Sequence, residues 1–162
     1  NDTYTGALGW LYPVSYGIKF HSKIEQNRDY VVPPLEGIWW ADDHTAYLED
    51  RRDEWLWTMM IRVPDWIDSS VFDQHVTKAA KKLGTPPDTL RLETLNEGQC
   101  AQIMHIGPYA DEAPTIAKMH NVFIPENGLI MNGNHHEIYL SDPRKTAPEK
   151  LKTVLRQPVK PA

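Results

Sequence analysis

The stretch Asn134-His135-His136-Glu137-Ile138-Tyr139-Leu140-Ser141-Asp142-Pro143 decides how this chain folds. Its isoleucine, tyrosine and leucine favour a strand, and the Asp-Pro pair at its end is typical of a turn. Neighbouring side chains of a strand point to opposite faces, so Ile138 and Leu140 share one face while Glu137 and Tyr139 share the other. Because burying a carboxylate without a partner is costly, we expect Glu137 and Tyr139 to point away from the helix-packed core. Glu137 is therefore the first candidate for a functional residue.

Size and composition are those of an ordinary globular domain. The chain has 162 residues, 41% of them hydrophobic and 24% charged, and we expect a single domain over residues 1–162. There is no apolar run of membrane-spanning length and no signal-peptide pattern, so we expect a cytoplasmic protein that does not contact a membrane. The lone cysteine, Cys100, excludes an intrachain disulfide and fits a reducing cytoplasm.

Charge and aromatic content indicate the kind of partner. The formal net charge is −5 and the basic residues are scattered apart from a modest C-terminal group, which argues against nucleic-acid binding because that requires a concentrated positive face. Six tryptophans and seven tyrosines accompany only three phenylalanines. Aromatic rings with a polar group are typical of surfaces that hold flat ligands, so we expect a small molecule as the partner and a monomer or homodimer as the assembly.

Apolar spacing and turn residues predict the other elements. Pro13 should kink or split the first helix, and Pro33-Pro34 should confine the first strand to an edge or a bulge. Asp68 and the serines after it should cap the second helix. An acidic loop is expected over 42–53. We expect His44 in this loop and His75 in the second helix to be surface residues. The predicted helices are 3–26, 70–83 and about 112–124. The predicted strands are 30–41, 54–63, 134–141 and 151–158, with 90–95 and 99–106 as one long strand or a bulged pair.

The order of these elements indicates an internal duplication. The second half runs strand–helix–strand–strand, and the first half runs helix–strand–strand, which is the same order without its first strand. We therefore expect half-repeats at 1–84 and 90–162 joined by a linker at 85–89, with the missing strand upstream of residue 1. The predicted fold is α+β: an antiparallel sheet with helices on one face and a ligand groove on the other. The pseudo-twofold axis should bring Glu36 and Glu137 together.

Several segments resemble a known family. His136-Glu137-Ile138-Tyr139-Leu140-Ser141-Asp142-Pro143, Ile103-Met104-His105-Ile106-Gly107-Pro108-Tyr109 and Leu155-Arg156-Gln157-Pro158 are similar to the GyrI-like small-molecule-binding family. Pro34-Leu35-Glu36-Gly37-Ile38-Trp39-Trp40-Ala41-Asp42 and Trp57-Thr58-Met59-Met60 resemble its stand-alone branch of cyclopropanoid cyclopropyl hydrolases. The resemblance implies duplicated strand–helix–strand–strand halves with an aromatic pocket. Pro13 and Pro125 depart from it, because plain helix formers are expected at both positions.

The resemblance also implies a substrate, a flat aromatic molecule whose strained cyclopropane is fused to a conjugated dienone. Opening the ring with water requires a group that aims the water, donors for the charge developing on the dienone oxygen, and walls that hold the planar body. Glu137 is the first candidate for the base and Glu36 the second, while Tyr109 and Tyr139 are candidate donors with His105 behind them. Candidates for ligand binding are Trp39, Trp40, Trp55, Trp57, Met59 and His135, the last on the strand face of Glu137.

Other interpretations of the same residues stay open. Glu137 could be a structural carboxylate satisfied by hydrogen bonds, and one of Trp55 and Trp57 could belong to the core. Trp39 and Trp40 point to opposite faces, so at most one of them lines a pocket. We expect neither a metal nor a cofactor, because the histidines lack ligand spacing on a helix and no nucleotide-binding fingerprint is present. The alternatives to hydrolysis are a sensor or sequestering protein for flat, even cationic, aromatics and, with no support from charge or patches, a gyrase-binding protein.

Overall fold

The computed structural model describes residues 2–43 and 51–162, and its chain divides into two compact units. Unit 1 comprises residues 1–33 and 59–95, and unit 2 comprises residues 34–58 and 96–162. These units differ from the predicted half-repeats, because the first strand packs with the second half of the chain. Most of the predicted acidic loop, with His44, lies outside the described residues. No described helix combines the length and apolar character that crossing a membrane would need.

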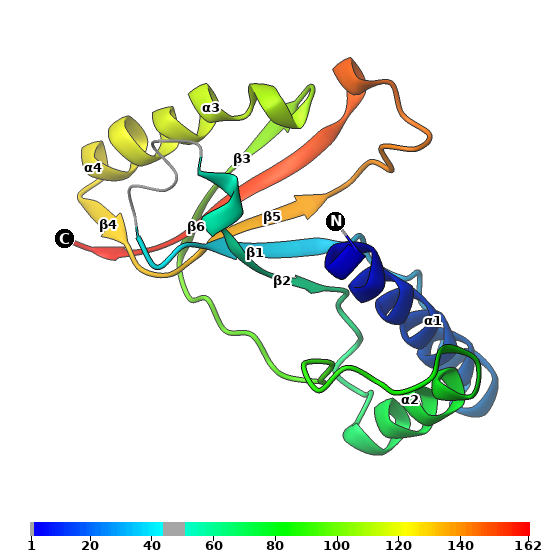
Figure 1. Ribbon diagram of the computed structural model, residues 1–162. Coiled ribbons are helices and arrows are strands. Elements are labelled where there is room, and N and C mark those ends of the chain that lie inside the picture. The colour runs from blue at the N-terminus through cyan, green and yellow to red at the C-terminus, as the bar shows by residue number, and fades with distance from the viewer. Residues whose placement is uncertain (1, 44–50) are drawn as a thin grey trace. The chain divides into compact units, whose positions relative to one another are not determined.

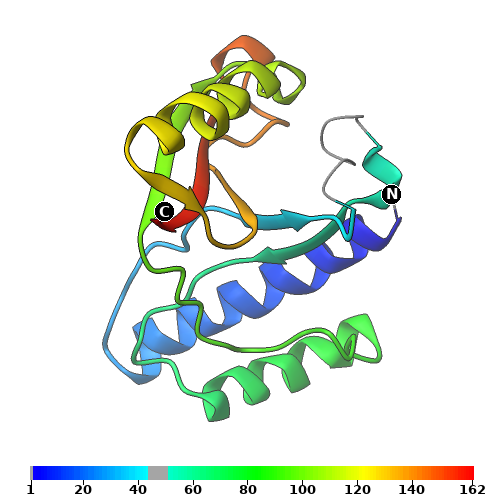
Figure 2. The ribbon, with the colours of Figure 1, turned by 90° about the vertical axis from the view of Figure 1, so that its left-hand side faces the viewer.

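Unit 1 is built on two helices that lie side by side, α1 (Asp2–Glu25) and α2 (Ser69–Leu83) (Figure 2). Both were predicted from apolar spacing, and both are confirmed. The expected break at Pro13 is absent, since α1 runs through it as one helix. Because proline has no N–H, the carbonyl of Gly9, four residues before Pro13, lacks its helical hydrogen bond. Both residues are exposed, so water can bind that carbonyl instead. The buried core of unit 1 consists of Trp10, Val14, Ile18, Ile67 and Val71.

The ends and the packing of α2 follow from a few residues. Asp68 caps the helix, accepting a hydrogen bond from the amide of Val71 at 3.0 Å, and Gly84 ends it with φ at 92°. Gly17 of α1 allows a close approach, because a Cβ at that position would lie 2.7 Å from Nδ1 of His75. The prediction that His75 is a surface residue is wrong, because its side chain fills this contact and is 7% exposed.

Unit 2 contains an antiparallel sheet in the strand order β2-β1-β5-β6-β3, with β4 also paired to β6 (Figure 1). The first strand is shorter than predicted, because Pro33-Pro34 cannot donate to the ladder. Residues 90–95, at the start of the second half, form no strand. A short strand before β5 was not predicted. The bounds are β1 Glu36–Trp40, β2 Leu56–Met60, β3 Cys100–Ile106, β4 Leu129–Met131, β5 His135–Tyr139 and β6 Lys152–Pro161.

One face of this sheet is covered by a continuous helical segment, which runs along β3 and β6 (Figure 1). The predicted helix 112–124 is present, but its parts differ in winding: η3 (Tyr109–Asp111), α3 (Ala113–Lys118), a π-turn η4 (Met119–Phe123) and α4 (Ile124–Glu126). Met119 and Ile124 pack on Ala101, Leu155 and Val159 of the sheet. Two further single turns are η2 (Arg52–Glu54) and η5 (Pro148–Lys150). The fold is therefore α+β with an open antiparallel sheet, as predicted.

Candidate functional site

Glu137 lies on the face of the sheet that the helices cover, which is the reverse of our expectation. The pairing of β5 sets Glu137 opposite Leu155 of β6, and residues directly opposite in an antiparallel pair point to the same face. Leu155 is fully buried beneath the helical segment. Ile138 therefore occupies the other face. The assumption that a carboxylate must avoid the helix-packed side was wrong, because Glu137 finds a second carboxyl group there.

That partner is Glu112, which occupies the N-cap position of α3 without a capping hydrogen bond from its side chain and is 7% exposed. Its side chain forms a hydrogen bond with that of Glu137. Oε1 of Glu112 and Oε2 of Glu137 are buried and receive no hydrogen bond from any N–H or O–H donor in the described chain. Burial, the negative charge of Glu137 and their mutual hydrogen bond raise the pKa of Glu112 to about 9. Glu112 is therefore a protonated carboxylic acid at neutral pH.

Two histidines lie next to the carboxyl pair. Nε2 of His135 is 3.6 Å from Oε1 of Glu137, with the two side chains only 10% and 12% exposed. The ring of His120, from the π-turn, meets the ring of His135 edge to face at a centroid distance of 6.3 Å. Burial, together with the charge of His135, lowers the pKa of His120, which favours a neutral ring. Both ring nitrogens of His135 and Nε2 of His120 are buried without a hydrogen bond in the described chain.

A row of aromatic side chains continues from this cluster. Tyr109 meets Tyr139 edge to face at 5.9 Å between ring centroids. The hydroxyl oxygen of Tyr139 accepts a hydrogen bond from Nε1 of Trp39 at 2.9 Å, and Trp39 meets Trp55 edge to face at 6.2 Å. Trp39 pairs with His135 across β1 and β5, so the row and the histidines share one face. Four of the predicted ligand-binding or donor residues thus lie in contact.

Glu36 lies elsewhere. It pairs with Ile138 across the strands, so it points to the face opposite Glu137, and the expected meeting of the two glutamates does not occur. Trp40 shares the face of Glu36, which leaves Trp39 as the one of the pair beside Glu137. Trp57 is half-buried in β2, and Met59 is buried and belongs to unit 1.

Glu36 instead belongs to a buried ionic network. Nε2 of His136 lies 2.9 Å from Glu36 and its Nδ1 lies 2.8 Å from Glu97, while Arg156 reaches the other oxygen of Glu97 at 3.4 Å. Both ring nitrogens donate to carboxylates, which requires the charged imidazolium. Burial by itself lowers the pKa of His136, but the hydrogen bonds and charges of Glu36 and Glu97 outweigh it, and the pKa is raised. This group holds β1, β5 and β6 together.

His105 supports the site from the side. Its Nε2 donates to the carbonyl oxygen of Pro108 at 2.9 Å, and the side chain is 8% exposed. The amide of Gly107 donates to the carbonyl of Leu151 at 2.8 Å in the same turn. These bonds hold the turn from which Tyr109 leaves, and they engage Nε2 of His105.

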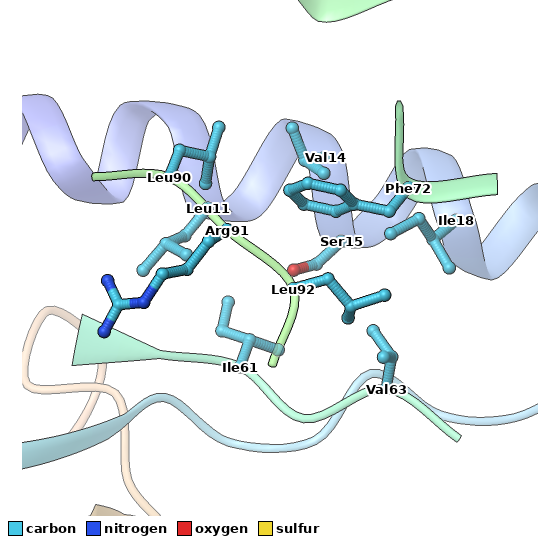
Figure 3. A pocket seen from close by; sticks show the side chains of 10 residues that line it. All are labelled: Leu11, Val14, Ser15, Ile18, Ile61, Val63, Phe72, Leu90, Arg91 and Leu92. Atoms are coloured by element: carbon cyan, nitrogen blue, oxygen red, sulfur yellow. The ribbon is translucent and has the colours of Figure 1, made fainter. Parts of the chain in front are cut away.

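The cavity that the structure contains in unit 1 is separate from these residues. It has a volume of about 50 Å³ and is lined mainly by apolar side chains of α1 and α2 and their neighbours (Figure 3). A water occupies about 30 Å³ in the liquid, so this space is far too small for a polycyclic ligand. None of the residues predicted for the site lines it.

The arrangement in unit 2 combines an acid with a possible base. Paired carboxyl groups with different protonation are a common source of general acid–base chemistry. No group of three or more metal-binding side chains occurs in residues 2–43 and 51–162 that could hold a metal ion. Sequence reasoning missed Glu112, because nothing in the local pattern distinguishes it from its neighbour Asp111, which the structure leaves exposed. Only the contact with Glu137 does so.

Three solved structures from Listeria innocua are similar to this chain. An uncharacterized conserved protein is 41% identical with a TM-score of 0.88, over 99% of this chain and 81% of its own. A structure described as a hydrolase is 41% identical with a TM-score of 0.80, over 97% of this chain and 79% of its own. A second hydrolase structure is 40% identical with a TM-score of 0.81, over 97% of this chain and 80% of its own.

A comparison with curated proteins finds no match. The model of the GyrI-like small molecule binding domain matches residues 5–160, nearly the whole chain. The resemblance that the sequence motifs indicated is thereby confirmed at the level of the family. The chain belongs to the GyrI-like small-molecule-binding domain family.

Proposed function

We propose that unit 2 binds a flat polycyclic aromatic molecule and opens its cyclopropane ring by adding water, which would detoxify cyclopropanoid DNA-alkylating compounds. Membership of a small-molecule-binding family supports the binding, and the two similar Listeria structures described as hydrolases support the reaction class. The observation that carries the proposal is Glu137, whose side chain is 12% exposed, beside the aromatic row of Trp55, Trp39, Tyr139 and Tyr109.

The chemistry assigns a task to each group. Glu137 takes a proton from water, and the water oxygen forms a bond to the ring methylene carbon. The carbon–carbon bond of the cyclopropane breaks, and its electron pair moves through the conjugated system onto the dienone oxygen, which becomes a phenol on protonation. Tyr109 and Tyr139 are proposed to donate to that oxygen, while Trp39 and Trp55 hold the planar body.

The same residues fit a second function, binding without turnover. Aromatic rings around a carboxylate also attract a cation, as in a sensor or sequestering protein. The two functions differ in what Glu137 does. A hydrolase needs its basicity at the reacting water, whereas a cation binder needs only its charge.

Mass spectrometry tests the proposal with a cyclopropane-bearing duocarmycin-like compound. We expect the wild-type protein to produce an adduct heavier by one water and Glu137→Gln to produce it on the order of 10²–10⁴-fold more slowly. Tryptophan fluorescence measures binding, which Glu137→Gln should retain because the amide has the shape of the carboxylate. Glu126→Gln is the matched control, since Glu126 is an exposed glutamate of α4 and should behave as the wild type.

Two results would contradict the assignments. Undiminished turnover by Glu137→Gln would remove Glu137 from the chemistry. Tight binding by the wild type without an adduct would favour the sensor or sequestering function, and loss of binding of a cationic aromatic in Glu137→Gln would then support it.

A further inference from the structure

We propose that Glu112 and Glu137 act as one acid–base pair, in which Glu112 protonates the substrate oxygen while Glu137 accepts the proton of water. The inference rests on the proposed function and deepens it. It adds Glu112 as a further catalytic residue, and it requires of the substrate an uncharged oxygen acceptor such as a carbonyl.

The placement of the two glutamates supports the pair. Glu137 stands in the middle of β5, held by ladder bonds to β1 and β6, and Glu112 comes from the turn between η3 and α3. Their carboxyl groups meet through a hydrogen bond, and both are nearly buried. Each element is fixed by its own packing. The fold, rather than an attraction between the two carboxyl groups, therefore keeps them next to each other.

A count of hydrogen-bond donors requires a proton between them. Oε1 of Glu112 and Oε2 of Glu137 are buried, and no N–H group and no serine, threonine or tyrosine hydroxyl of the described chain donates to either. Two ionised carboxylates repel each other, so a hydrogen bond between the two groups needs a proton on one. The raised pKa of Glu112 agrees with that proton residing on Glu112.

The pair balances the reaction without another proton carrier. Water gives one proton to Glu137 and its hydroxyl to the ring carbon, and Glu112 gives its proton to the oxygen that receives the electron pair. Glu137 is then protonated and Glu112 ionised, so a transfer along their hydrogen bond restores the starting state. The net change is the addition of one water to the substrate.

This arrangement also selects a substrate class. A protonated carboxyl donates a hydrogen bond and has no charge, so it favours an oxygen with a lone pair and does not attract a cationic group. A neutral, carbonyl-bearing aromatic therefore fits the pair better than a cation does. An analogue whose carbonyl is replaced by a methylene should bind more weakly to the wild type, and Glu112→Gln should change its binding little.

The surrounding titratable groups are few. On β5 they are His135 and Tyr139, on the π-turn His120, and on η3 Tyr109. His120 is neutral at pH 7, because burial and the charge of His135 lower its pKa. In residues 2–43 and 51–162, no ion pair joins a lysine or arginine to Glu112 or Glu137, so changes in pH above 7 act first on Glu112.

Carbon NMR of protein labelled at the glutamate carboxyl carbons tests the pair without any substrate. We expect one carboxyl to keep its proton at pH 7 and to titrate near pH 9. That signal should disappear in Glu112→Gln, and its titration should move to lower pH in Glu137→Gln, where the negative charge is gone. Release of all glutamate protons below pH 7 would overturn the pair.

Turnover of the duocarmycin-like compound tests the catalytic task. We expect Glu112→Gln to lose turnover on the order of 10²-fold or more while retaining binding, and the wild-type kcat/KM to fall as pH rises through about 9. Asp111→Asn, a neutral change at the exposed preceding residue, is the matched control and should leave both unchanged. Urea unfolding at pH 8 should show Glu112→Gln to be at least as stable as the wild type, because the wild-type protein must take up a proton at Glu112 on folding, whereas the neutral amide needs none.

The outcomes separate the two proposals. Full turnover by Glu112→Gln, with loss of turnover by Glu137→Gln, would overturn the acid–base pair and leave the hydrolase proposal standing. Absence of the water adduct with the wild type would overturn both. Loss of folding in Glu112→Gln would contradict the protonated state, because a glutamine replaces a protonated glutamate in shape and donor.

Discussion

Consecutive residues of β5 serve two separate polar groups on opposite faces of the sheet. Glu137 joins Glu112 on the helix-covered face, while His136 joins Glu36 and Glu97 on the other. In the proposed mechanism the first group supplies a proton. In the second group an imidazolium is held between two carboxylates. Substitutions in the two groups should therefore differ, affecting turnover in one and stability in the other.

His136→Leu should destabilise the protein strongly. It leaves the buried carboxylate of Glu36 and the partly buried carboxylate of Glu97 without the imidazolium, and breaking a buried ion pair from one side costs about 3–5 kcal/mol. Urea unfolding at pH 6 measures the free energy. Lys160→Ala, at an exposed residue of β6, is the control and should change it by less than about 0.5 kcal/mol. A cost for His136→Leu no larger than that of the control would contradict the network.

The stability that His136 contributes should depend on pH in a defined direction. Its pKa in the folded protein is raised above the ordinary value of 6.5. The contribution is therefore fully present below pH 6.5 and is lost as the pH rises through the raised pKa. Unfolding free energies measured from pH 6 to pH 9 should show the gap between wild type and His136→Leu narrowing as the pH increases. A gap that widens would mean that the ring is neutral in the folded state.

Among the elements, the two helical segments respond differently to their prolines. In α1 the proline is exposed and the helix continues, because the exposed carbonyl of Gly9 can bind water. Before Pro125 the chain widens into the π-turn, which relieves the clash of the proline ring with the carbonyl four residues earlier. The π-turn carries His120, the residue that meets His135 beside the carboxyl pair. The departure from plain helix formers at this position thus shapes the site.

The N-cap of α2 is an element whose contribution can be measured directly. Asp68→Ala removes the side-chain acceptor of the Val71 amide and should lower the free energy of unfolding by about 1 kcal/mol. Asp68→Asn is the control, because asparagine caps helices about as well as aspartate. Urea denaturation of the three proteins provides the test, and equal losses in both variants would show that charge rather than capping stabilises α2.

For the molecule as a whole, β6 should be the slowest part to exchange its amide hydrogens. It pairs with β5 on one side and with β3 on the other, and Thr153 and Leu155 are fully buried within it. Opening these bonds requires disrupting both neighbours together, so their exchange should approach global unfolding. Hydrogen-exchange mass spectrometry provides the measurement, with the exposed segment 93–96 as the fast reference. Exchange in β6 as fast as in that segment would contradict this arrangement.

Local signals in the sequence were sufficient for the helices of unit 1 and for the strands around Glu137. Apolar spacing located α1 and α2, and the cap of α2 was visible as Asp68 followed by serines. Alternation along β5 correctly grouped Glu137 with Tyr139, and alternation along β1 separated Trp39 from Trp40. It left open which face the helices would cover. The duplication of halves and the strand upstream of residue 1 remain predictions.

By itself, the sequence determined the class of fold, the family and most of the aromatic side chains that lie beside Glu137, because periodicity and long motifs are written in neighbouring residues. Only the tertiary structure decided that Glu137 lies beneath the helices with Glu112 as its partner, and that Glu36 points to the opposite face. Those facts depend on strand register and on contacts between residues 25 and 100 positions apart. A carboxyl group acquires its protonation from what surrounds it in space, so no local pattern could distinguish Glu112 from Asp111.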